Sequence, residues 1–168
     1  MADISFTMDR IGNAPEIQEL VGQYKREMVR RNMDSGWPND DIYHFAAIYL
    51  NGEPLSMVCF APIVAHKTVY ITGAYTRPSW RRLGIYETLM RECINQWRAE
   101  GCYDQLRSGF NKKNHISRLL QEKRGAVVAE EKENAFRTTF SLKPTGEEWE
   151  LKPECLKPLL DRLEPLLG

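Results

Sequence analysis

The chain has 168 residues, 42% of them hydrophobic and 27% charged, and its 23 basic residues balance its 23 acidic ones. This composition is typical of one soluble globular domain, and it argues against a protein that binds nucleic acid through its phosphate backbone. Because the four cysteines form no CxxC pair and no apolar run could span a membrane, we expect a cytoplasmic protein without a disulfide framework, a metal site or a membrane partner.

The first elements alternate between a strand pattern and a helix pattern. Residues 4–8 alternate apolar and polar side chains, which predicts an opening strand. Asn13 precedes an alanine, a proline and a glutamate, which favours a helix that Asn13 caps and that continues to about Asn32.

The loop at residues 33–41 contains turn residues, three acids and an aromatic side chain. Trp37 and Asp34, together with Asp40 and Asp41, could receive a cationic amine. The interpretation that we favour is simpler: Trp37 covers the edge of the core while the acids stay in solvent. The loop is therefore a candidate for substrate specificity and no more.

Three strands are expected next, at residues 43–50, 55–65 and 68–75. The first two are joined through Asn51 and Gly52. Asn-Gly is a strong hairpin signal because both residues tolerate a positive φ.

The loop after the third strand carries Arg81, Arg82 and Gly84, and apolar residues then recur at helical spacing from Ile85 to Trp97. The first N–H groups of a helix lack partners, and the helix dipole favours negative charge there. Since Gly84 also permits a close approach to the backbone, the loop could cradle a diphosphate. Most strand–loop–helix connections bind nothing, so this chemistry alone does not decide the function.

The rest of the chain predicts a strand at 103–110, a helix opened by Asn114, and two strands at 126–129 and 135–142. A leucine stripe at 153–167, interrupted by prolines, predicts a C-terminal helical extension. An exposed leucine stripe is costly. The extension should therefore pack on its own domain or on a second copy of the chain, which would make a homodimer.

Two blocks of sequence carry a resemblance to a known family. The spacing Arg81-x-x-Gly84-x-Tyr86 resembles the acetyl-CoA signature of the GNAT superfamily of N-acetyltransferases, Gln/Arg-x-x-Gly-x-Gly/Ala. Residues 114–126 (NHISRLLQEKRGA) resemble the family's asparagine-opened helix, which ends in a Leu-Tyr-Glu-Lys-x-Gly-Phe-like run. The blocks agree with the family in order and spacing over roughly half of the chain.

The resemblance implies an α/β (α+β) fold with a mixed, mostly antiparallel sheet of six to seven strands flanked by helices. It implies that the strand at residues 68–75 diverges from its neighbour in the sheet. We expect a single GNAT-like domain at residues 1–143 and a helical extension at 144–168.

The resemblance also implies a site for acetyl-CoA. In the family, main-chain groups at the end of the strand that corresponds to residues 68–75 pair with the pantetheine arm. The asparagine that opens the later helix bonds the same arm. For Asn114 the alternative is a helix cap, and the two roles are compatible. The residues expected to bind the cofactor are Tyr75, Thr76, Arg81, Arg82, Leu83, Gly84, Ile85, Tyr86, Asn114 and Ser117.

The sequence departs from the family at two positions. Tyr86 stands where a small residue is usual, and Gln121 replaces a tyrosine that commonly protonates the leaving thiolate. Glutamine has no titratable proton to give. The catalytic residues are therefore unassigned, and the candidates are Tyr75, Tyr86, Ser117 and Glu53.

The expected function is transfer of an acetyl group from acetyl-CoA to a primary amine by direct attack in a ternary complex. An amine with an unperturbed pKa of about 10.4 must first lose a proton, either to a base or in a desolvating pocket. The acceptor could be a small molecule or a protein. Two alternatives stay open: an inactive module that binds acyl-CoA, and an interaction protein that uses the leucine stripe.

Overall fold

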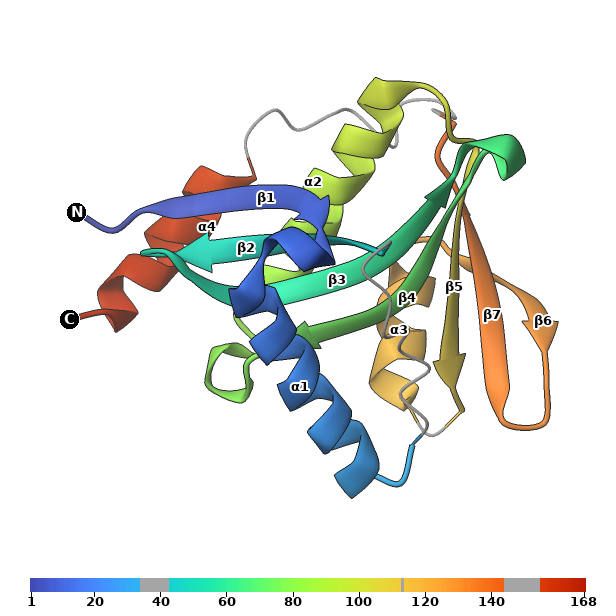
Figure 1. The fold of residues 1–168 in the computed structure, drawn as a ribbon, viewed down its shortest axis with the longest axis horizontal. Coiled ribbons are helices and arrows are strands. Elements are labelled where there is room, and N and C mark those ends of the chain that lie inside the picture. Colours follow the sequence, from blue (N-terminus) through green and yellow to red (C-terminus); the bar gives the residue numbers. More distant parts are fainter. Residues whose placement is uncertain (34–42, 113, 144–154) are drawn as a thin grey trace.

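The computed structural model describes residues 1–33, 43–112, 114–143 and 155–168, and it is built around one seven-stranded sheet (Figure 1). The expected residues Trp37 and Asp34 lie outside the described residues. The order of the strands in the sheet is β1-β2-β3-β4-β5-β7-β6. The strands are β1 Ile4–Arg10, β2 His44–Leu50, β3 Glu53–Ile63, β4 Thr68–Thr76, β5 Gln105–Asn111, β6 Val127–Glu131 and β7 Ala135–Ser141. The helices are α1 Pro15–Arg30, α2 Ile85–Glu100, α3 His115–Lys123 and α4 Leu156–Leu163.

Neighbouring strands are antiparallel except for β4 and β5, which are parallel. The hairpin between β2 and β3 turns through Asn51 and Gly52, whose φ angles of 52° and 82° are those that the sequence required. The predicted fold class, a mixed and mostly antiparallel sheet flanked by helices, is confirmed.

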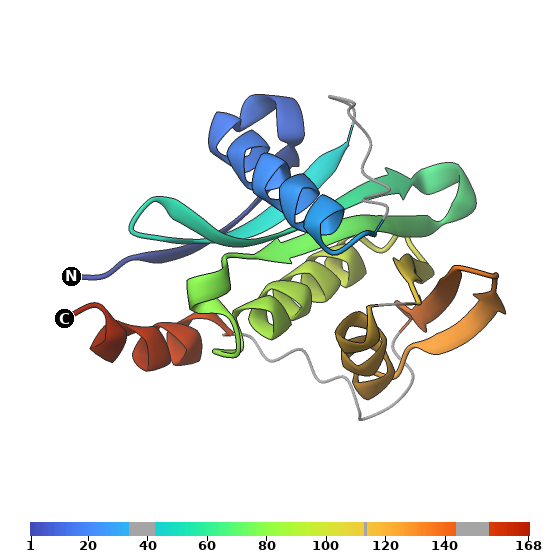
Figure 2. The same ribbon diagram turned by 90° about the horizontal axis from the view of Figure 1, so that it is seen from below.

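Helices cover both faces of the sheet (Figure 2). Helix α1 packs on one face, where Ile17, Leu20 and Tyr24 meet side chains of β2, β3 and β4. Helices α2 and α4 lie on the opposite face, where Leu89, Ile94 and other residues of α2 form the larger core with the sheet. The apolar periodicity of both helices explains this arrangement, because each helix buries one stripe.

The predicted start of α1 was wrong in detail. Asn13 belongs to a short 3₁₀ turn, and its side-chain Nδ2 donates a hydrogen bond to Asp9 Oδ1 at 3.1 Å. The residue at the N-cap is Ala14, which offers no side-chain bond, and Pro15 is the first helical residue. Proline is suited to that position because its missing N–H would have no partner there. The helix ends at Arg30 rather than near Asn32.

Strands β4 and β5 stay together over only part of their length. Their pairing joins Thr68–Ile71 to Gln105–Ser108, and beyond Ile71 strand β4 continues beside β3 alone. The register between β3 and β4 shifts at this point, because Cys59 pairs with Gly73 while Phe60 pairs with Ile71. Thr72 is thus an extra residue, a β-bulge of the kind that bends a strand. It opens a gap between β4 and β5 that Figure 1 shows at the centre of the molecule.

The leucine stripe near the C-terminus packs on the chain's own core. Leu159 and Leu163 of α4 are fully buried against α2 and the sheet, while Leu166 and Leu167 stay exposed. The backbone N–H of Cys155 bonds the carboxylate of Glu92 on α2. The division into a domain at 1–143 and an extension from 144 stays a prediction. Among the described residues, none of the helices is both long and apolar enough to cross a membrane.

Candidate active site

A cleft of about 750 Å³ lies where β4 and β5 diverge. Its walls are the second half of β4, the loop that precedes α2, the cleft-facing side of α1, and the second half of β5. The later part of α3, Asn114 before that helix, and the start of β7 complete the lining. The cleft therefore joins the two sequence blocks on which the family resemblance depends.

The loop at the start of α2 presents unpaired backbone donors. Gly84 and Arg82 have left-handed backbones, with φ angles of 81° and 66°. Both the backbone N–H and the hydroxyl of Thr88 bond the carbonyl of Gly84, which begins the helix. In the described part of the chain, the amides of residues 82–87 donate to no acceptor. Such amides, together with the positive end of a helix, suit a phosphate group.

The guanidinium of Arg81 is held by protein groups. Its Nη1 and Nη2 donate to Oε1 and Oε2 of Glu27, each at 2.9 Å, and its Nε donates to the carbonyl of Thr76 at 2.8 Å. The same group lies 5.3 Å from the ring centroid of Tyr75. A two-point Arg–carboxylate pair fixes geometry as well as charge. Arg81 thus ties the loop to α1 and to the end of β4.

Tyr75 and Thr76 form the last part of β4 along the cleft. The ring of Tyr75 is buried and meets the ring of Tyr24 edge to face, with 6.2 Å between centroids. The hydroxyls of Thr76 and Ser56 lie 2.7 Å apart in a hydrogen bond that anchors β4 to β3. Since β5 has already diverged, the edge of β4 that faces the cleft has main-chain groups available for an extended ligand.

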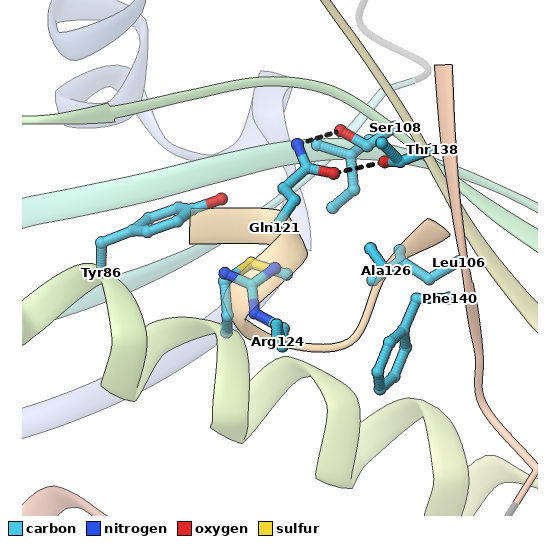
Figure 3. A pocket seen from close by; sticks show the side chains of 10 residues that line it. Tyr86, Leu106, Ser108, Gln121, Arg124, Ala126, Thr138 and Phe140 are labelled. Carbon is cyan, nitrogen blue, oxygen red and sulfur yellow. Dashed lines mark hydrogen bonds between the residues drawn. The ribbon is translucent and has the colours of Figure 1, made fainter. Parts of the chain in front are cut away.

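The ring of Tyr86 does not block the loop that precedes α2. It points from α2 toward α3 (Figure 3), and the guanidinium of Arg124 lies 5.7 Å from the ring centroid. Burial raises the pKa of Tyr86, while Arg124 acts in the opposite direction. The phenol is therefore protonated at neutral pH, and it lines the cleft beside Gln121.

Gln121 is buried and both ends of its amide are bonded (Figure 3). Its Nε2 donates to Ser108 Oγ on β5 at 3.0 Å, and its Oε1 accepts a hydrogen bond from Thr138 Oγ1 on β7. The bonds hold α3 against both strands. A small cavity of about 10 Å³ lies beside these groups and is also lined by Tyr86 and Arg124.

Most of the expected cofactor residues line the same cleft. Those that do so are Tyr75, Thr76, Arg81, Arg82, Gly84, Ile85, Tyr86 and Asn114. Leu83 packs against the core and Glu53 lies at the start of β3, so neither is part of the lining. Ser117 belongs to α3, but its side chain is outside the described residues.

Sequence reasoning missed the wall that α1 contributes. Glu27, Met28 and Arg31 in the last turns of the helix, and Met33 just after it, all line the cleft. The basic residues near the end of this helix were already explained by their favourable interaction with the negative end of the helix dipole. Glu27 belongs to no motif, and its partner Arg81 is 54 residues away in sequence. A pairing over that distance leaves no local signal.

A comparison with protein families decides the assignment. The sequence model of the family described as "Acetyltransferase (GNAT) family" matches residues 14–126. The chain belongs to the GNAT family. A comparison with curated proteins gives no match for it. The family match confirms the predicted membership of the GNAT superfamily and the predicted class of enzyme, an acyltransferase.

Many solved structures share this GNAT fold. The ribosomal-protein-S18-alanine N-acetyltransferase from Escherichia coli aligns with a TM-score of 0.65 at 12% identity, over 88% of this chain and 99% of its own. PaiA N-acetyltransferase from Thermoplasma acidophilum, in complex with coenzyme A, aligns with a TM-score of 0.61 at 13% identity, over 83% and 99%. Campylobacter jejuni PseH, in complex with acetyl coenzyme A, aligns with a TM-score of 0.59 at 14% identity, over 82% and 99%. Acetyl-CoA is accordingly the cosubstrate expected for a GNAT enzyme, as the sequence predicted.

Proposed function

We propose that this GNAT protein transfers the acetyl group of acetyl-CoA to a primary amine by direct attack within a ternary complex. The observation that carries the proposal is the cleft itself. One continuous wall joins the open edge of β4 to the unpaired amides of residues 82–87. An elongated thioester that carries a diphosphate matches this arrangement, with its extended arm along β4 and its diphosphate at the amides.

The chain's own groups would hold the cosubstrate mainly through the backbone. The amides of residues 82–87 and the dipole of α2 would take the diphosphate, with Arg82 adding charge. Main-chain groups of Tyr75 and Thr76 would pair with the extended arm, and Asn114 would contact it from the start of α3. Two structural neighbours, PseH and PaiA, bind acetyl coenzyme A and coenzyme A respectively.

The acceptor amine would enter beside α1. The described lining there is mostly apolar or aromatic and includes Tyr24, Met28, Met33 and Phe110. Such surroundings disfavour the charged form of an amine, and so lower its pKa. The only described carboxylate on that wall, Glu27, has both oxygens bonded to Arg81. Desolvation of the amine is thus the route to a nucleophile that the lining supports best.

Tyr86 is our candidate for the proton donor to the leaving thiolate. Gln121 has no titratable proton, and its amide is occupied by Ser108 and Thr138. Tyr86 lines the cleft next to it, and its raised pKa keeps the phenol protonated at neutral pH. The two departures from the family pattern would then be related, because Tyr86 supplies a hydroxyl where Gln121 cannot.

Thermal shift measurements with acetyl-CoA, coenzyme A and longer acyl-CoAs test the first half of the proposal. We expect stabilisation by acetyl-CoA, since a ligand that binds only the folded state raises its melting temperature. A panel of amines with detection of free thiol tests the second half. Thiol release with at least one amine is expected. Binding without any release would favour the inactive module, and an absence of binding would exclude both.

A further inference from the structure

Helix α4 runs antiparallel to α2 and ends at the loop before it. At one end of the pair, the backbone N–H of Cys155 bonds Glu92 in the middle of α2. At the other end, Arg162 meets Gly84, the residue that caps α2. The seven residue steps from 155 to 162 and the eight from 92 to 84 span similar lengths, because each step along a helix rises about 1.5 Å. The buried Leu159 and Leu163 hold α4 in this register.

The guanidinium of Arg162 lies directly against Gly84. A Cβ atom added to Gly84 would be 3.0 Å from Arg162 Nη2 and 3.8 Å from its Cζ. The cation thus occupies the space that only a glycine leaves open at this point of the loop. It lies beside the amides of residues 82–87, which donate to no acceptor in the described part of the chain.

The charge of Arg162 is placed unfavourably for the protein alone. A cation is destabilised at the N-terminal end of a helix, where the dipole is already positive. None of the ion pairs found among the described residues involves Arg162, and the exposed Arg82 adds a second cation to the same loop. An anion bound at the loop would reverse this balance, because it would face two cations and the helix dipole together.

We propose that Arg162 binds a phosphate group of the nucleotide part of acetyl-CoA, which makes the C-terminal helix part of the cofactor site. The inference rests on the proposed placement of acetyl-CoA at residues 82–87. It adds a contact from outside residues 14–126, the segment that matches the family. The phosphate is either in the diphosphate or at the 3′ position of the ribose. Both offer the same charged oxygens to a guanidinium.

The test compares the wild-type protein with Arg162→Gln by calorimetric titration with coenzyme A and with 3′-dephospho-coenzyme A. Loss of one charge-assisted contact should weaken the binding of coenzyme A by about tenfold. The affinity of the variant should also depend less on salt, since one screened charge pair is gone. An equal loss with both ligands would identify the diphosphate as the partner. A loss confined to coenzyme A would identify the 3′-phosphate.

Lys157→Gln is the matched control, because Lys157 is an exposed cation on the same helix. It should bind both ligands as the wild type does. Arg162 is exposed, so Arg162→Gln should keep the melting temperature of the free protein. Unchanged affinity in Arg162→Gln, or an equal loss in Lys157→Gln, would overturn the inference while leaving the proposed function intact. If the wild-type protein binds neither ligand, the proposed function itself fails.

Discussion

At the scale of single residues, the site depends on backbone groups that side chains hold in place. The amides of residues 82–87 are the donors, and Gly84 allows the loop to turn into α2 with a φ of 81°. Arg81 contacts Glu27 and the carbonyl of Thr76, so its part is to position the loop. Substitutions should therefore separate residues that shape the backbone from residues that act on the substrate.

Gly84→Ala should weaken the binding of acetyl-CoA at least tenfold, a drop that calorimetric titration would measure. The new Cβ would meet Arg162 at 3.0 Å, and the left-handed backbone would be strained. That strain alone should lower the free energy of unfolding by about 1 kcal/mol. Gly101→Ala is the control at the other end of α2, where φ is 72° and nothing lies within 4 Å. It should share the loss of stability but not the loss of affinity.

Tyr86→Phe should reduce kcat by about a hundredfold, the usual scale for losing a proton donor, with little change in KM for acetyl-CoA. The ring and its packing against Arg124 remain, and only the hydroxyl is lost. The raised pKa of Tyr86 also sets the sign of the pH dependence. Because the active form is the protonated phenol, this group should cause no loss of rate below pH 10.0, the ordinary pKa of tyrosine.

Gln121→Ala provides the contrast in the same steady-state assay. It should leave kcat within a few-fold while lowering the melting temperature, because Ser108 and Thr138 lose their partner. A large fall in kcat for Gln121→Ala, with Tyr86→Phe fully active, would show that the two roles are the reverse of those proposed.

At the scale of elements, the bulge at Thr72 creates the cleft. The Thr72 hydroxyl donates to the carbonyl of Cys59 at 3.1 Å, which gives that carbonyl a partner where the register between β3 and β4 shifts. The last paired residue of β4 on the β5 side is Ile71, so the strands part where the bulge lies. Helix α1 then closes the other side of the cleft and is joined to the loop through Glu27 and Arg81.

Glu27→Gln and Arg81→Gln should each weaken the binding of acetyl-CoA several-fold by loosening the loop. Their effect on the free energy of unfolding should be below about 1 kcal/mol, since the pair is partly exposed to solvent. Titrations of both single variants and the double variant would measure the coupling between the two residues. The double variant should lose no more affinity than either single one. Fully additive losses would mean that Arg81 contacts the cofactor directly.

Much of the fold followed from local patterns, whereas the contacts that complete the site did not. The spacing from Ile85 to Trp97 and the Asn51–Gly52 turn predicted their elements, because periodicity and φ preference are local. Asn13 had the right residue type for a cap, but Asp9 takes its side chain. The bulge at Thr72 and the approach of Arg162 to Gly84 depend on tertiary packing and have no signature in sequence.

At the scale of the whole molecule, α4 completes the core on the α2 face. Leu159→Ala should lower the free energy of unfolding by about 2–5 kcal/mol, as for other buried leucines. Leu167→Ala, at a position that is 41% exposed, should change it by less than about 0.5 kcal/mol. Urea denaturation of both variants would measure the difference. Similar small losses would mean that α4 is docked only loosely in solution.

The packing of α4 against β1 couples two segments that are far apart in the chain. Ile4, Phe6 and Met8 of β1 share one hydrophobic cluster with Leu159 and Leu163. Neither segment can separate from the sheet without exposing the other's apolar side chains to water. The amides of β1 and α4 should therefore exchange their hydrogens with solvent in a single opening event, and a nucleotide held by Arg162 would slow exchange at the opposite end of the sequence.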